Sequence, residues 1–214
     1  MDIIADFNGA KIRKTIHLIR HGQTDFNKQG IIQGSGIDSD LNETGRWQAL
    51  RFFESYQSHP YDHIYTSKLR RTIQSVEPFI QKGIQHTPLD EFNEINWGIM
   101  EGRKSSPETA HLYDSIVKKW SSGAIDTAIE KGETPLEMYN RQAKGMQYLM
   151  SKTHEEQVLI CMHGRAIRSF LCLLTGVPLM EMEKWHHNNL CLYELEYRGP
   201  YFEIVKANDQ SHLL

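Results

Sequence analysis

The sequence predicts an α/β fold with a largely parallel central sheet and helices on both faces. Strand-like and helix-like segments alternate along most of the chain, which is the pattern of such folds. The segment 158–162 (VLICM) is a continuous apolar run, as expected for a strand covered on both faces. A chain of 214 residues can bury one sizeable core, so we expect a single domain over 1–214.

The first half of the chain contains strands separated by helices. A helix is expected over 41–56, with Asn42 or Thr44 as its N-cap. A second helix runs from Leu69 through Phe79, and Pro78 should end or kink it. The strands of this half are short runs rich in β-branched and aromatic residues, at 15–19 (TIHLI), 63–67 (HIYTS) and 84–89.

Residues 105–155 are mostly helical in pattern, with breaks around residues 121–123 and 132–135. We interpret this block as a helical cap region over one edge of the sheet. After the 158–162 strand, a helix over 164–174 is ended by Gly176 and Pro178. Two late runs, 191–197 and 202–207, have the pattern of a hairpin. Residues 1–14 fit none of these elements and predict an extra strand or a tail.

Composition excludes several classes of protein. The 24 Lys and Arg residues nearly balance the 27 Asp and Glu residues, giving a net charge of −3. A protein that bound nucleic acid mainly through phosphates would carry a basic excess, so no nucleic-acid partner is expected. No signal peptide is visible, and no apolar run is long enough to span a membrane. We therefore expect a cytoplasmic protein without a membrane partner.

The three cysteines carry no recognisable chemistry. Cys161, Cys172 and Cys191 are an odd number without CxxC spacing, so neither a disulfide framework nor a zinc site is indicated. All three lie in apolar stretches, where a buried thiol is the expected state.

Polar residues follow two of the predicted strands. Arg20-His21-Gly22 follows the first strand, and His163-Gly164-Arg165 follows the 158–162 strand. Carboxyl ends of parallel strands meet at one edge of a sheet, so the two histidines should face one crevice. A glycine after each histidine would let the backbone approach a ligand, and a helix start there would favour an anion. With Arg70-Arg71 after the 63–67 strand, this set suits a phosphate.

Other interpretations of these residues compete. A single histidine at a strand end is more often structural, and an Arg-Arg pair that opens a helix is usually solvated. For Arg165, a surface position and a role in selecting acidic substrates are both open. His186-His187 and the His59/His63 pair could be metal ligands, but no HExxH motif or acidic cluster accompanies them. We expect neither a metal nor another cofactor.

The order of motifs resembles that of the histidine phosphatase superfamily, the phosphoglycerate-mutase-like enzymes. The resemblance runs from about residue 15 to the C-terminus and begins with the run Leu18–Thr24 (LIRHGQT). The further matching blocks are Gln33-Gly34, Leu41–Gly45, Thr66–Thr72, Phe92–Glu94, Gly132–Thr134 with Arg141, and Val158–Gly164.

The resemblance implies a metal-independent mechanism with a phosphohistidine intermediate. His21 would attack phosphorus, and Glu94 would protonate the leaving oxygen and later activate water. Arg20, Arg71 and His163 would hold the phosphoryl oxygens. The expected substrate-binding residues are Asn27, Gln33, Gly34 and Gly164.

The resemblance also indicates a branch. The segment 103–131 is shorter than the insertion of most mutases, and 208–213 is similar to the ending of α-ribazole phosphatases. A phosphatase of small phosphorylated metabolites is therefore the first interpretation. A phosphoglycerate mutase is the alternative, and a non-catalytic phosphate-binding or protein-interaction module is an alternative of another class. The sequence leaves the oligomeric state open, a homodimer included.

Overall fold

Six strands form one sheet in the computed structural model, which describes residues 13–214. Their order across the sheet is β3-β2-β4-β1-β5-β6. The first four run parallel, β5 is antiparallel to β1, and β6 is antiparallel to β5. The predicted, largely parallel sheet is confirmed. The strands are β1 (Thr15–Arg20), β2 (His63–Thr66), β3 (His86–Pro88), β4 (Gln157–Met162), β5 (Leu192–Tyr197) and β6 (Phe202–Asp209).

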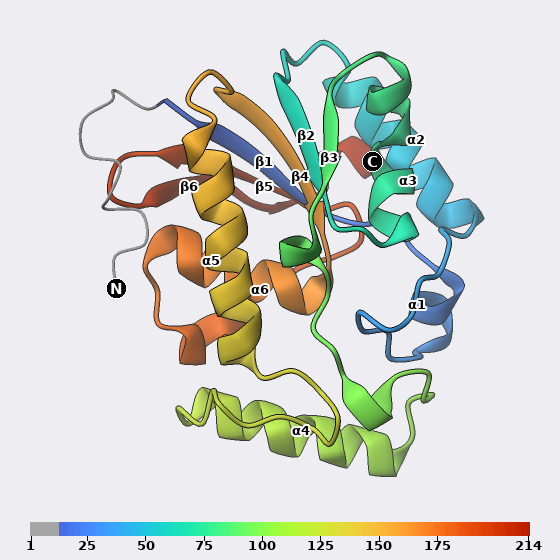
Figure 1. The fold of residues 1–214 in the computed structure, drawn as a ribbon. Coiled ribbons are helices and arrows are strands. Elements are labelled where there is room, and N and C mark those ends of the chain that lie inside the picture. The colour runs from blue at the N-terminus through green and yellow to red at the C-terminus, as the bar shows by residue number, and fades with distance from the viewer. Residues whose placement is uncertain (1–12) are drawn as a thin grey trace.

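Helices cover both faces of this sheet, as predicted (Figure 1). α2 and α3 lie on one face, and α5 and α6 lie on the other. α4 lies beyond the end of the sheet, away from the strands. The helices are α1 (Asp25–Gln29), α2 (Glu43–Tyr56), α3 (Arg70–Gln81), α4 (Pro107–Ser121), α5 (Pro135–Ser151) and α6 (Gly164–Thr175).

Alternate side chains of the central strands enter two separate cores. Ile16 and Leu18 of β1 pack in the core under α5 and α6, whereas Ile19 packs in the core under α2 and α3. The same division holds along β4, where Val158 and Leu159 enter opposite cores. A strand with both faces buried needs apolar residues at every position, which explains its continuous apolar run. The cysteines expected to be buried, Cys161, Cys172 and Cys191, are free and buried.

Three local expectations need correction. α3 continues through Pro78 to Gln81, so the helix does not end there. Pro78 lies in the last turn, where its missing N–H removes a single helical hydrogen bond, and the buried Phe79 anchors that turn. The strand expected over 84–89 is shorter, from His86 to Pro88. The five-residue helix α1, capped by Thr24, was not anticipated.

The helices of the 105–155 block differ in their packing. α5 places Met138, Met146 and Leu149 in the core under the sheet, whereas α4 buries Ile116 and Trp120 at the far end of that core. The extra strand or tail expected over residues 1–14 lies mostly outside the described residues. The backbone oxygen of Lys14 accepts a hydrogen bond from the Tyr197 N–H at 2.9 Å, and β1 begins at Thr15.

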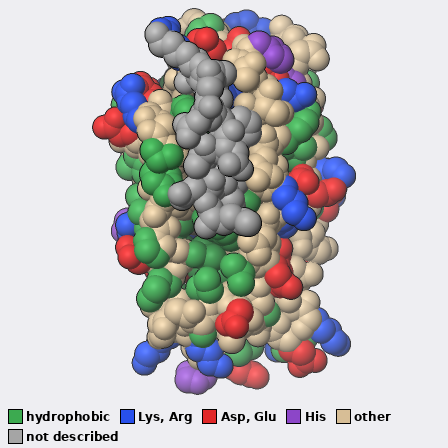
Figure 2. Space-filling view, turned by 60° about the vertical axis from the view of Figure 1, so that its left-hand side comes forward, with side chains coloured by type: hydrophobic (Ala, Val, Ile, Leu, Met, Phe, Trp, Pro, Cys, Tyr) green, Lys and Arg blue, Asp and Glu red, His purple; other side chains and the backbone are tan. Residues whose placement is uncertain are grey.

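The surface agrees with the near balance of charge. On the face drawn in Figure 2, acidic and basic side chains are scattered and neither sign forms a continuous patch, whereas hydrophobic side chains gather in several patches. Among residues 13–214, no helix has the length and apolar character needed to cross a membrane.

Candidate active site

A small cavity lies at the carboxyl ends of the parallel strands. β1, β4 and β2 are neighbours in the sheet, and Arg20, His163 and Ser67 stand at or just after their carboxyl ends. The cavity has a volume of about 180 Å³. The residues that line it are Arg20, His21, Asn27, Ile32, Gln33, Arg71, Glu94, Trp97, Tyr113, Gly164, Arg165 and His187.

His21 is buried in this cavity as a neutral imidazole. Its Nδ1 lies 2.7 Å from the backbone oxygen of Gly22, which can only accept, so Nδ1 carries the proton and Nε2 keeps a free lone pair. Burial lowers the pKa of His21 well below 6.5, and repulsion from Arg71 and Arg20 lowers it further. His21 therefore presents an unprotonated nitrogen at neutral pH.

Arg20 has an unsatisfied donor in the same cavity. Its Nε is buried without a hydrogen-bond partner among residues 13–214. Burial also lowers the pKa of Arg20, because the charged guanidinium is removed from water. A buried cation with a free donor is costly unless an anion pairs with it. Arg20 thus provides a position for an anionic ligand.

Arg71, the second guanidinium group of the cavity, is buried and is held by hydrogen bonds to the protein. It is 1% exposed, and burial lowers its pKa to about 10. Nη1 donates to the Ile37 backbone oxygen at 2.6 Å and Nη2 to that of Gly34 at 3.2 Å. Its neighbour Arg70 is exposed and pairs with Asp38 instead. Of the Arg70-Arg71 pair, the structure places only Arg71 in the cavity.

His163 connects this guanidinium to the end of β2. Arg71 Nε donates to His163 Nδ1 at 3.1 Å, so His163 carries its proton on Nε2, 2.8 Å from Ser67 Oγ. Its ring centroid lies 5.2 Å from that of His21. Both nitrogens of His163 therefore have protein partners, and contact with a phosphoryl oxygen would require the release of one of them. Its expected role on the oxygens stays a prediction.

Glu94 is 6% exposed and is bound by backbone donors on both carboxylate oxygens. Oε1 accepts from the N–H groups of Ile95 (3.0 Å) and Ala166 (2.8 Å), and Oε2 accepts from the Arg165 N–H at 3.1 Å. Two of these donors belong to the first turn of α6. The anion expected at this helix start is thus the side chain of Glu94, not a ligand.

The two glycines after the histidines differ in what surrounds them. A Cβ on Gly22 would lie 2.6 Å from the Gly45 backbone oxygen, so Gly22 allows α2 to pack against the first strand end. A Cβ on Gly164 would lie 2.8 Å from Cε1 of His187 and 3.5 Å from Nε of Arg20. Only Gly164 is required by the cavity itself.

The expected substrate-binding residues fall into two groups. Asn27 and Gln33 line the cavity together with Gly164. Asn27 Oδ1 accepts from the backbone and hydroxyl of Thr24, and Gln33 Nε2 donates to Thr24 Oγ1 at 2.8 Å. Gly34 is not a lining residue, and its carbonyl oxygen binds Arg71.

The cavity also contains residues that sequence reasoning did not assign to it. His187 lines it, and burial lowers the pKa of His187 to about 3, so its imidazole is neutral. Asn189 donates from Nδ2 to the His21 backbone oxygen at 2.9 Å. Both precede β5, which runs antiparallel to β1 and therefore begins at the edge where β1 ends. Trp97 and Tyr113 form an aromatic part of the wall.

Arg165 is not a surface residue. It is 4% exposed, and its terminal nitrogens donate to Glu183 and to the Tyr113 hydroxyl. Its guanidinium carbon lies 5.7 Å from the centroid of Trp97 and 5.5 Å from that of Trp120. Arg165 links α6 to α4 and thereby fixes the Tyr113 side of the cavity.

The metal interpretation gains no support from the histidine pairs. Within the range 13–214, no three His, Cys, Asp or Glu side chains are grouped so that they could hold a metal ion. His59 instead lies against His17, and His63 contacts Thr87 and Glu155.

A model of the histidine phosphatase superfamily (branch 1) matches residues 16–210 of this chain. A Bacillus subtilis protein named "Uncharacterized phosphatase PhoE" is 31% identical over 199 residues, covering 92% of this chain and 95% of the relative. A Proteus mirabilis protein named "Probable phosphoglycerate mutase GpmB" is 28% identical over 205 residues, covering 92% and 94%.

Solved structures have the same fold. The α-ribazole phosphatase of Shigella flexneri superimposes with a TM-score of 0.78 at 20% identity, covering 91% of this chain and 96% of that one. This likeness confirms the fold expected from the sequence.

Proposed function

We propose that this chain, which belongs to the histidine phosphatase superfamily, is a phosphatase of small phosphorylated metabolites that works through a phosphohistidine on His21 without a metal ion. The observation that carries this proposal is that one cavity holds both a neutral His21, with a free Nε2, and the Arg20 guanidinium, whose buried Nε has no partner among the described residues. Such a cavity combines a nucleophile with a position for the anion that it attacks.

In the first step, the Nε2 lone pair of His21 attacks phosphorus and the bond to the leaving oxygen breaks. The imidazole becomes positively charged as the N–P bond forms, and the Gly22 carbonyl that accepts from Nδ1 stabilises that charge. Arg20 and Arg71 hold the phosphoryl oxygens, whose charge is spread over them in the transition state.

Glu94 supplies the proton for the leaving oxygen in this proposal. Oε2 accepts one backbone N–H and Oε1 accepts two, so Oε2 is the oxygen with room for the proton. In the second step the Glu94 carboxylate takes a proton from water, the water oxygen attacks phosphorus, and the P–N bond breaks. Phosphate leaves, and both His21 and protonated Glu94 are regenerated.

A screen of phosphorylated metabolites tests the proposal. Phosphate release should occur in the presence of EDTA and should be abolished in His21→Ala. Complete loss of activity in EDTA, restored by a divalent cation, would contradict the metal-independent mechanism.

A mutase activity is the second candidate, because one of the relatives is named as a phosphoglycerate mutase. A mutase transfers the phosphoryl group from His21 back to a phosphoglycerate, whereas a phosphatase transfers it to water. Bisphosphoglycerate-dependent interconversion of phosphoglycerates, faster than phosphate release, would favour the mutase. A non-catalytic phosphate-binding module is the candidate of another class, and bound phosphate without turnover of any tested ester would favour it. The expected cytoplasmic location stays a prediction.

A further inference from the structure

The loop that carries Glu94 lies outside the sheet and the long helices. It connects the 3₁₀ turn Asp90–Phe92 to the 3₁₀ turn Gly98–Met100. Strand pairing therefore cannot fix the position of Glu94. Other contacts must hold its carboxylate at the first turn of α6.

Arg141 of α5 supplies two such contacts. Its Nη1 donates to the Glu91 backbone oxygen at 2.7 Å, and its Nη2 donates to that of Glu94 at 3.1 Å. One of these carbonyls lies within the turn before Glu94, and the other belongs to Glu94 itself. One guanidinium therefore fixes the backbone that carries the proposed acid.

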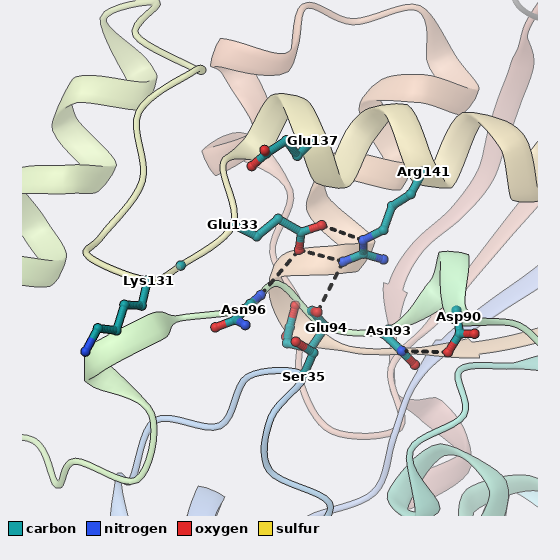
Figure 3. A pocket seen from close by; sticks show the side chains of 10 residues that line it. Ser35, Asp90, Asn93, Glu94, Asn96, Lys131, Glu133, Glu137 and Arg141 are labelled. Atoms are coloured by element: carbon teal, nitrogen blue, oxygen red, sulfur yellow. Dashed lines mark hydrogen bonds and ion pairs between the residues drawn. The ribbon is translucent and has the colours of Figure 1, made fainter.

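Glu133 fixes both Arg141 and the other side of the loop. Its carboxylate receives Nε and Nη2 of Arg141 at 2.6 and 2.9 Å, a bidentate pair. The same carboxylate accepts from the Asn96 N–H at 3.3 Å, and the Glu133 N–H donates to the Asn96 oxygen at 2.8 Å. Figure 3 shows the pair between α5 and the loop.

This pair is not part of the apolar core. Glu133 and Arg141 line an open cavity of about 610 Å³, next to the loop and separate from the small catalytic cavity. Their side chains are 18% and 22% exposed. Glu94 lines both cavities, so the residue lies between the pair and the reacting groups.

We propose that Glu133 and Arg141 are positioning residues for Glu94, and that their role in the reaction is to hold this carboxyl group where it protonates the leaving oxygen. This inference rests on the proposed role of Glu94. Neither residue contacts the small cavity, so neither should affect attack by His21 directly. Their loss should slow the reactions that need a proton donor.

The test compares the first step on two substrates. Nitrophenolate can leave without being protonated, whereas the glycerol oxygen that leaves glycerol phosphate needs a proton. We expect Arg141→Met to slow single-turnover phosphorylation of His21 by glycerol phosphate by up to about 10²-fold, and that by nitrophenyl phosphate much less. Glu133→Gln should act in the same direction with a smaller effect. Arg141→Lys should be intermediate, because an ammonium cannot hold two carbonyls and a carboxylate.

A second readout reports the position of the Glu94 carboxylate without measuring activity. The N–H groups of Arg165 and Ala166 bind its carboxylate, so their NMR resonances report whether it is in place. We expect them to move in Arg141→Met toward the positions found in Glu94→Ala. Arg51→Met is the matched control, because Arg51 forms an exposed pair with Glu54 at 2.9 Å, and it should leave both readouts unchanged.

The outcomes distinguish the positioning role of Glu133 and Arg141 from the acid role of Glu94. Equal losses on both substrates, wild-type rates, or unmoved Arg165 and Ala166 resonances in Arg141→Met would overturn the positioning role. If Glu94→Gln itself slows both substrates equally, the acid role of Glu94 fails, and the resonances still test whether the pair holds its carboxylate. Should Arg141→Met not fold, the same criteria apply to Arg141→Lys and Glu133→Gln.

Discussion

His17 and His21 belong to the same stretch of chain and share most of their local properties, yet only His21 lies in the small cavity at the carboxyl ends of the strands. Each is 3% exposed, and each has a pKa lowered chiefly by burial, to about 4 for His17. His17 Nδ1 pairs with the Tyr61 hydroxyl at 2.7 Å, and His21 Nδ1 pairs with the Gly22 oxygen at 2.7 Å. Burial and neutrality therefore do not distinguish a nucleophile.

The surroundings of Nε2 distinguish His21 from His17. His17 packs against the His59 ring at 4.4 Å between centroids, and its Nε2 lies 3.9 Å from a Glu194 oxygen. His21 has the guanidinium groups of Arg20 and Arg71 near it instead. An anionic phosphate is attracted to the second environment and repelled by the carboxylate of the first.

The largest expected effect is the loss of the nucleophile. His21→Ala should reduce turnover by several orders of magnitude, because it removes the nitrogen that forms the N–P bond in the proposed mechanism. His17→Gln should keep turnover within a few-fold of the wild-type enzyme. Steady-state rates on nitrophenyl phosphate, with circular dichroism to confirm folding, measure both. If the two variants lost activity equally, the comparison between the histidines would fail.

The next effect concerns the guanidinium next to His21. Arg71→Lys should lower kcat by about 10²–10³-fold, because an ammonium cannot bind phosphoryl oxygens, His163 and the loop carbonyls together. Arg70→Lys is the matched control, since Arg70 is exposed and pairs with Asp38, and it should lower kcat only slightly. If Arg70→Lys lowered kcat strongly and Arg71→Lys did not, Arg70 would be the arginine that serves the reaction.

Much of the fold and the site could be predicted because the signals are local in sequence. Buried strands follow from apolar runs, and residues directly after parallel strands reach one edge of the sheet. His187 and Asn189 carry no such signal, because they precede a strand whose antiparallel direction cannot be known from its residues. The burial of Arg165 depends on Trp97, Trp120 and Glu183, which are distant in sequence and meet it only in the fold.

A third prediction separates the causes of the two lowered pKa values. Repulsion from Arg71 is the second cause for His21 and is not among those for His17. Arg71→Gln should therefore raise the pKa of His21, which stays below 6.5 because burial is the larger cause, and leave that of His17 unchanged. NMR titration of the two imidazoles measures this. A pKa of His21 that does not move in Arg71→Gln would refute the electrostatic contribution.

The smallest effect is on stability. In the unfolded chain His17 becomes protonated below about pH 6.5, whereas in the folded chain it does so only near pH 4. The free energy of unfolding therefore decreases as the pH is lowered through this range. Between about pH 7.5 and 5.5, His17 should account for a decrease of about 1 kcal/mol in the free energy of unfolding. Urea unfolding of His17→Gln should show a shallower pH dependence by that amount. An unchanged slope would show that folding does not lower the pKa of His17.

The most direct test of the phosphohistidine mechanism is to trap the intermediate. The enzyme is mixed with a phosphorylated substrate, quenched in alkali within one turnover, and digested for mass spectrometry. We predict a phosphoryl group on His21, stable in alkali and labile in acid, that is absent from His21→Ala and present in His17→Gln. A phosphoryl group on another residue, or product formation at the wild-type rate with no labelled protein, would contradict the mechanism.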